Sequence, residues 1–223
     1  LGALALATQA PSVPAHDEPR ETLPARNTRP AAILAAAALC GAAVLGLEVL
    51  WFRLMQLFVA GQSAIFAVML AVVLLGIGLG GLAAGRWLAS APSAFRWTPF
   101  VSLACGFLVQ ATYASFDQAL AARGISFTGS VLDTLLLSLW LMLPVSALSG
   151  LLFTLLGRAL EPDAAHESAS AGALTVANTV GAAAGSLLTA FVLIPRLGVE
   201  GSLFALSLLY VAVAGLTARL AAA

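Results

Sequence analysis

The sequence predicts an all-α, polytopic membrane protein, and three observations support this fold class. First, 61% of the 223 residues are hydrophobic and only 9% are charged, whereas a soluble domain carries roughly a quarter charged residues. Second, the mean hydropathy is +1.02. Third, charged residues divide the chain into apolar runs, several of them close to the roughly 20 residues that a spanning helix needs. Such a chain cannot cover a water-facing surface, so we expect the lipid bilayer to be its solvent.

The apolar runs predict six transmembrane helices in one domain over residues 31–223. Residues 1–30 are rich in Ala and Pro and predict a disordered N-terminal tail, because prolines block a long helix. The uncharged run over 54–85 is too long for one span, and the polar triplet at 61–63 is the expected turn inside it. The helices are expected at about 32–58, 63–88, 97–116, 131–157, 172–194 and 201–219.

The distribution of arginines predicts the orientation of these helices. With six spans, both termini and the loops after the second and fourth helices lie on one side of the membrane. That side holds Arg20, Arg26, Arg29, Arg86, Arg96, Arg158 and Arg219. The other side holds Arg53, Arg123 and Arg196. Because positive residues concentrate on the cytoplasmic side, we expect both termini in the cytoplasm and the chain in a bacterial inner membrane.

Composition and motif content argue against several functional classes. The formal net charge is zero, so the basic patch of a nucleic-acid binder is not expected. Cys40 and Cys105 form no C-x-x-C pair, and the two histidines, His16 and His166, are far apart in sequence, which disfavours a metal site. No nucleophile motif or pair of catalytic carboxylates is recognisable. We therefore expect no catalytic residue, no metal and no cofactor.

The glycine-rich stretch "LLGIGLGGLAAGR" over 74–86 fits the G-x-G-x-x-G pattern of dinucleotide-binding turns. Such a turn follows a strand and opens a helix, whereas these glycines stand late in a run long enough to span a membrane. We therefore interpret them as small residues that let neighbouring helices approach closely. At about 100° per residue, one face carries Gly76, Gly80 and Ala84, and another carries Gly78, Gly81 and Gly85.

The fifth predicted helix has a similar face in "LTVANTVGAAAGSLLTA". Gly181 and Gly185 form a G-x-x-x-G pair, and Asn178 and Thr189 lie on the same side. An amide in contact with lipid would lack hydrogen-bond partners, so Asn178 should face protein or a water-filled cavity. Two interpretations remain open for Asn178: a hydrogen bond that fixes helix packing, or a contact with a substrate.

Glu48, in "LGLEVLWFRLMQ", is the strongest candidate for a functional residue. A charge at the centre of a bilayer costs roughly 2.5–3.5 kcal/mol on insertion scales, so such residues usually face an interior and have a partner. Glu48 is either a structural residue bonded to another helix or a cation-binding group in a translocation path. Arg53 is about 140° around the helix from Glu48 and is expected as an interfacial anchor, whereas Gln56 shares the Glu48 face better.

The fourth predicted helix contains Pro144, which should kink it and leave the Trp140 carbonyl without its usual donor. Ser138 and Ser149 share a face of this helix. These hydroxyls either line a cavity or compensate for the kink.

Three stretches together resemble the membrane portion of the spermidine synthase-like membrane proteins. They are "LGLEVLWFRLMQLF", "FAVMLAVVLLGIGLGGLAAGRWL" and "LTVANTVGAAAGSLLTAFVLIPRLGVEGSL". The resemblance covers roughly residues 33–219 and implies one half of a major-facilitator-like bundle, which that family fuses to a synthase-like domain. The sequence contains no methyltransferase-like nucleotide motif, so we do not expect the enzymatic activity of that family in it.

Two functions remain from the sequence. In the first, the chain is a non-catalytic membrane subunit or anchor that packs with other membrane subunits or with a second copy of itself. In the second, it is a transporter-like bundle that binds a small molecule through Glu48 and Asn178. The family resemblance then implies a polyamine-like cation as ligand.

Overall fold

The computed structural model describes residues 30–59, 62–124, 130–160 and 167–221, and these residues are almost entirely helical. The predicted N-terminal tail lies outside the described residues except for Pro30, which begins the first helix. The elements are α1 (Pro30–Met55), α2 (Gln62–Ser90), the 3₁₀ helix η1 (Pro92–Trp97), α3 (Thr98–Ala114), α4 (Phe116–Arg123), α5 (Val131–Leu160), α6 (Glu167–Leu188), the π-helical η3 (Thr189–Leu193) and α7 (Ile194–Ala221).

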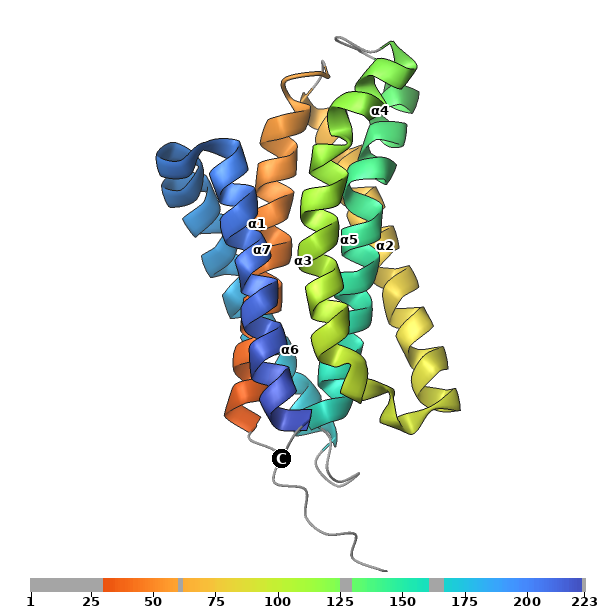
Figure 1. The fold of residues 1–223 in the computed structure, drawn as a ribbon, viewed down its shortest axis with the longest axis vertical. Helices are drawn as coiled ribbons and strands as arrows, with labels where there is room; N and C mark the ends of the chain where they lie inside the picture. Colours follow the sequence, from red (N-terminus) through yellow and green to blue (C-terminus); the bar gives the residue numbers. More distant parts are fainter. Residues whose placement is uncertain (1–29, 60–61, 125–129, 161–166, 222–223) are drawn as a thin grey trace, which may run out of the picture.

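The long helices run side by side along the longest axis of the molecule (Figure 1). The short α4 lies at one end of the bundle, and the C-terminus lies at the other end, where α1 begins (Figure 1). The chain reverses its direction between α6 and α7, so that α7 returns to the end from which α6 started (Figure 1). All-α architecture is therefore confirmed.

Glycines set two close helix contacts in this bundle. On α2, a Cβ at Gly76 would lie 2.7 Å from the Cβ of Ser146 on α5, and one at Gly80 would overlap the carbonyl oxygen of Ala147. On α6, a Cβ at Gly181 would overlap the backbone of Ala38 on α1. Glycine at these positions lets the backbone of α2 contact that of α5, and the backbone of α1 contact that of α6. Such van der Waals contact stabilises helix pairs in lipid.

Several helix ends differ from the predicted ones. The first helix ends at Met55 because Leu57 donates to Leu54 and Phe58 to Met55, which tightens the chain into turns. The fifth begins five residues before the predicted 172, at Glu167. The segment after the third predicted span also forms a helix of its own, α4, which ends at Gly124 in the left-handed conformation. Such ends depend on capping and turn geometry, to which hydropathy is insensitive.

A break between the last two helices was predicted between 194 and 201, and the helical path is interrupted within this interval, at Gly198. Pro195 lacks the N–H that would bond the preceding turn. The π-helical turn Thr189–Leu193 precedes it, and the N–H of Ile194 bonds the carbonyl of Thr189. Gly198 is non-helical with φ 68° and ψ −172°, and the chain bends there.

Among the described residues, four helices are long and apolar enough to cross a bilayer: Pro30–Met55, Phe66–Ser90, Val131–Leu160 and Ser168–Ala218. The bent pair Pro92–Ala114 and Phe116–Ala122 raises this number to five if it forms one span. These helices indicate an integral membrane protein. This number is below the six predicted helices, because the last two predicted helices are counted together in the single run Ser168–Ala218.

The distribution of large apolar side chains agrees with a lipid environment. The bundle has a buried centre that includes Trp51 and Tyr210. Outward-facing side chains are nevertheless also apolar: Phe107 is 71% exposed and Phe191 is 75% exposed. In a protein surrounded by water, exposed apolar patches on this scale would mark binding or aggregation surfaces. In a bilayer they are the expected contact with lipid tails.

Candidate ligand-binding groove

A groove of about 650 Å³ runs along the second half of α1, between the start of α2 and the π-helical segment η3. Its volume is within the roughly 300–1,000 Å³ that is typical of small-molecule sites. Three of the four polar candidates from the sequence, Glu48, Arg53 and Gln56, line it together. The remaining lining residues are apolar: Leu45, Val49, Phe52, Phe66, Met69 and Ala190.

Glu48 is half-buried on the span Pro30–Met55, seven residues before its end. At 1.5 Å per residue this places Glu48 about 10 Å along the helix axis from the end of α1 at Met55. The Glu48 carboxylate makes no hydrogen bond or ion pair with any residue that the structure describes. An interhelical bond between Glu48 and another described residue, which was one of the two interpretations, is therefore not observed.

Arg53 and Gln56 occupy the end of the groove closer to the end of α1. Arg53 is exposed and Gln56 is half-buried. Arg53 lies five residues after Glu48, which gives a rise of about 7.5 Å and a rotation of about 140°. No ion pair joins Glu48 to Arg53. The groove therefore carries two opposite charges that are separated along its length.

An aromatic pair forms part of the groove wall. The rings of Phe52 on α1 and Phe66 on α2 meet edge to face, with centroids 5.9 Å apart and planes at 85°. Both side chains line the groove. Aromatic faces attract organic cations, so this wall suits an ammonium group as well as an alkyl chain.

Asn178 lies outside this groove. A Cβ at Gly41 would be 2.9 Å from the Asn178 side-chain oxygen and would overlap its backbone oxygen, so Asn178 packs on α1 at Gly41. Gly41 is seven residues, or about 10 Å, before Glu48 on α1. The Asn178 side chain makes no hydrogen bond with the part of the chain that the structure describes. The structure therefore separates the two polar residues that the transporter hypothesis combined.

The predicted glycine faces of α2 have different surroundings. Gly76 and Gly80 lie against α5, as described above. A Cβ at Gly81 would make only an ordinary contact, 3.6 Å from the Thr154 hydroxyl oxygen. Gly78 and Gly85 are exposed and have no described atom within 4 Å of a built Cβ. On α6, Gly185 resembles Gly181, since its Cβ would overlap the backbone of Ala42.

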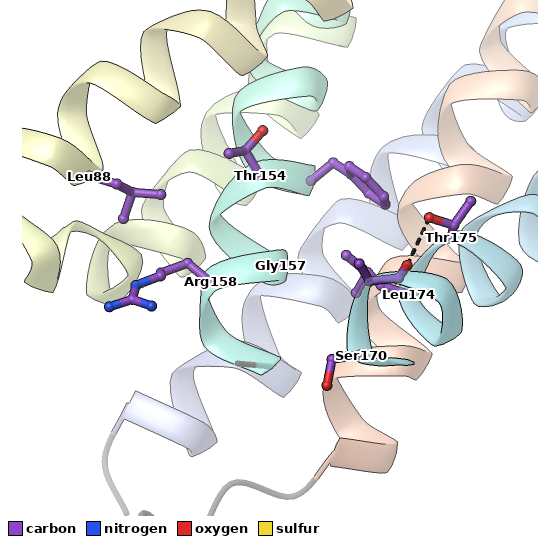
Figure 2. Close-up of a pocket in the computed structure, with 9 residues that line it drawn as sticks. Leu88, Thr154, Gly157, Arg158, Ser170, Leu174 and Thr175 are labelled. Atoms are coloured by element: carbon purple, nitrogen blue, oxygen red, sulfur yellow. Dashed lines mark hydrogen bonds between the residues drawn. The ribbon is translucent and has the colours of Figure 1, made fainter. Parts of the chain in front are cut away.

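A second pocket of about 340 Å³ lies at the opposite end of the bundle, between the ends of α2 and α5 and the start of α6 (Figure 2). The hydroxyls of Thr154 and Thr175 bond carbonyls of their own helices, Gly150 and Ala171. Arg158 extends toward Leu88 and away from Ser170 (Figure 2). Because its polar groups do not converge, this pocket is a weaker candidate than the groove.

Sequence reasoning missed a buried polar cluster at the centre of the bundle. The hydroxyls of Ser149 on α5 and Tyr210 on α7 are 2.9 Å apart, and the Ser102 hydroxyl on α3 donates to the Tyr210 carbonyl at 2.6 Å. Cys105 lies beside Ser149. Ser149 was noted as a polar residue on the kinked helix, but Tyr210 stands in an apolar run that gave no signal. Ser138, in contrast, is buried with no hydrogen-bond partner among the described residues.

No group of three or more metal-ligating side chains occurs in the described ranges of the chain. The two cysteines are free and buried. No protein-family model, no curated protein and no solved structure matches this chain. The groove along α1 therefore has to be interpreted from its own chemistry.

Proposed function

We propose that this chain is a transporter-like binding protein of the membrane, and that the Glu48 groove holds a small ligand with a cationic group. One observation carries the proposal: a carboxylate inside a membrane span lines a groove of small-molecule size and has no partner among the described residues. Ionisable residues within spans are costly and are typical of ion or substrate pathways. A bound cation would supply the partner that Glu48 lacks.

The test is equilibrium binding of organic amines to the purified protein in lipid nanodiscs. Glu48→Gln keeps the size and shape of the side chain, removes its charge and replaces one acceptor oxygen with an NH2 donor. Binding should weaken about tenfold or more, which is the usual effect of losing one charge-assisted contact. Glu200→Gln is the matched control, because Glu200 is exposed on α7 and does not line the groove. Equal affinity in wild type and Glu48→Gln would remove Glu48 from the function.

We infer that the bundle crosses the membrane six times. The run Ser168–Ala218 contains 51 residues, which at 1.5 Å each measures about 77 Å, more than twice the roughly 30 Å of a hydrocarbon core. The non-helical Gly198 inside this run is where its two crossings would meet. Six crossings agree with the resemblance to half of a major-facilitator-like bundle, and the arginine distribution favours cytoplasmic termini in a bacterial inner membrane.

A second candidate function is that of a non-catalytic subunit or anchor, and the outward face of α2 favours it. Gly78 and Gly85 are exposed on this face, and nothing described lies within 4 Å of a Cβ built at either glycine. A second copy or another membrane subunit could approach closely there. Gly78→Leu should then abolish copurification of that subunit in mild detergent and leave the chain itself folded. Purification of only the monomer from the wild-type protein would contradict this candidate.

A further inference from the structure

The groove contains a positive as well as a negative side chain, and this narrows the class of ligand. Glu48 and Arg53 both line it, and they do not pair with each other. A purely cationic ligand that satisfies Glu48 would be repelled by Arg53. A purely anionic one would be repelled by Glu48. Only a ligand with both charges, held some ångströms apart, offers each side chain an opposite partner.

The remaining polar and aromatic groups assign an end of the groove to each charge. Gln56 follows Arg53 by three residues, directly after the end of α1, and both side chains line the groove. The Gln56 amide and the Arg53 guanidinium together offer several donors to an anion. The Phe52–Phe66 pair adds ring faces that favour an ammonium group. The cationic end therefore belongs with Glu48 and the anionic end with Arg53 and Gln56.

Depth along α1 decides between a lipid and a water-soluble ligand. Glu48 lies about 7.5 Å farther from the end of α1 than Arg53 does, and the span ends at Met55. The anion is therefore the shallower group and the ammonium the deeper one. In a phosphatidylethanolamine the order is reversed, because the phosphate joins the acyl-bearing glycerol and the amine points to water. The groove has the charge order of a soluble molecule that enters with its amine first.

On these grounds we propose that the groove binds a water-soluble zwitterion, an amino-acid-like compound with an ammonium and a carboxylate group. Its ammonium pairs with Glu48, and its carboxylate pairs with Arg53 and Gln56. The proposal rests on the function proposed above and adds to it the anionic end of the ligand.

Three probes with chains of similar length separate the alternatives. Butylamine carries one cation, putrescine carries two, and γ-aminobutyrate carries a cation and a carboxylate. In nanodiscs, the wild-type protein should bind γ-aminobutyrate about tenfold more tightly than butylamine, and putrescine most weakly. Arg53→Gln should remove the preference for γ-aminobutyrate and improve putrescine binding, whereas Glu48→Gln should weaken all three. Glu200→Gln should leave all three affinities unchanged.

The outcomes distinguish this inference from the function on which it rests. If putrescine binds wild type at least as tightly as γ-aminobutyrate and depends on Glu48, the zwitterion is wrong and the cation site stands. If no probe binds at millimolar concentration, or none depends on Glu48, both are wrong. Arg53→Gln tests the zwitterion even if Glu48→Gln fails to fold. Phosphatidylethanolamine that is retained through detergent purification, and lost in Arg53→Gln, would assign the groove to a lipid headgroup instead.

Discussion

The hydroxyl oxygens of Ser149 on α5 and Tyr210 on α7 lie 2.9 Å apart at the centre of the bundle, where both side chains are buried. The Ser102 hydroxyl on α3 bonds the carbonyl of the same tyrosine. Three helices are thus joined by neutral hydrogen bonds among otherwise apolar neighbours. The buried Ser149 and Tyr210 hydroxyls thus bond each other, and the Ser102 hydroxyl bonds a backbone carbonyl.

We expect Tyr210→Phe and Ser149→Ala each to lower the free energy of unfolding by about 0.5–2 kcal/mol, because each removes the hydrogen bond between the two buried hydroxyls. The double variant should cost less than the sum of the two. Thermal unfolding in detergent, analysed as a double-mutant cycle, measures this coupling. Strictly additive effects would mean that the two hydroxyls do not act on each other.

The α2–α5 contact predicts opposite effects at two glycines on the same helix. Gly80→Ala should destabilise the bundle by about 1–3 kcal/mol, because the new methyl group overlaps the Ala147 carbonyl. Gly78→Ala should be neutral or slightly stabilising, because its methyl group meets no described atom and alanine favours helix. The midpoint of thermal unfolding of each variant in detergent is the measurement. A loss of stability at both positions would contradict this packing.

The bend within the last long run predicts another pair of opposite effects. Gly198, with φ 68° and ψ −172°, has a conformation essentially restricted to glycine, so Gly198→Ala should cost about 1–3 kcal/mol. Gly215 lies in regular helix with no described atom near a built Cβ, and Gly215→Ala should be neutral or stabilising. Thermal unfolding of the two variants compares them directly. Tolerance of alanine at position 198 would argue against this bend.

The helices and two glycine packing faces, one on α2 and one on α6, could be predicted from the sequence for physical reasons. Apolar runs of spanning length predict helices, because in lipid the backbone N–H and C=O groups can be satisfied only by hydrogen bonds within the protein. Small residues at helical spacing likewise pointed to the face with Gly76 and Gly80, and this face lies against α5. The outward position of Gly78 could not be foreseen, because small residues suit helix contact whether or not a neighbour is present.

The composition of the groove could be predicted only in part. Glu48 and Gln56 were grouped by their positions on one helix, and such local geometry follows from the helical repeat. Asn178 was added because it is polar, although its helix packs one face on Gly41, about two turns from Glu48. Contacts between helices depend on the pairs of apolar faces that pack together. In a chain whose helices are apolar on nearly all sides, the sequence pattern does not show which faces form these pairs. For the same reason Tyr210 was missed.

As a ligand site, the Glu48 groove should be reached from water. The test is to treat Glu48→Cys in proteoliposomes with a membrane-impermeant cationic methanethiosulfonate. The native thiols of Cys40 and Cys105 are buried and should contribute little background. Phe191→Cys is the matched control, because Phe191 is 75% exposed next to the groove residue Ala190 but does not line the groove. We predict modification of Glu48→Cys and none of Phe191→Cys, whereas an unreactive Glu48→Cys would contradict the account.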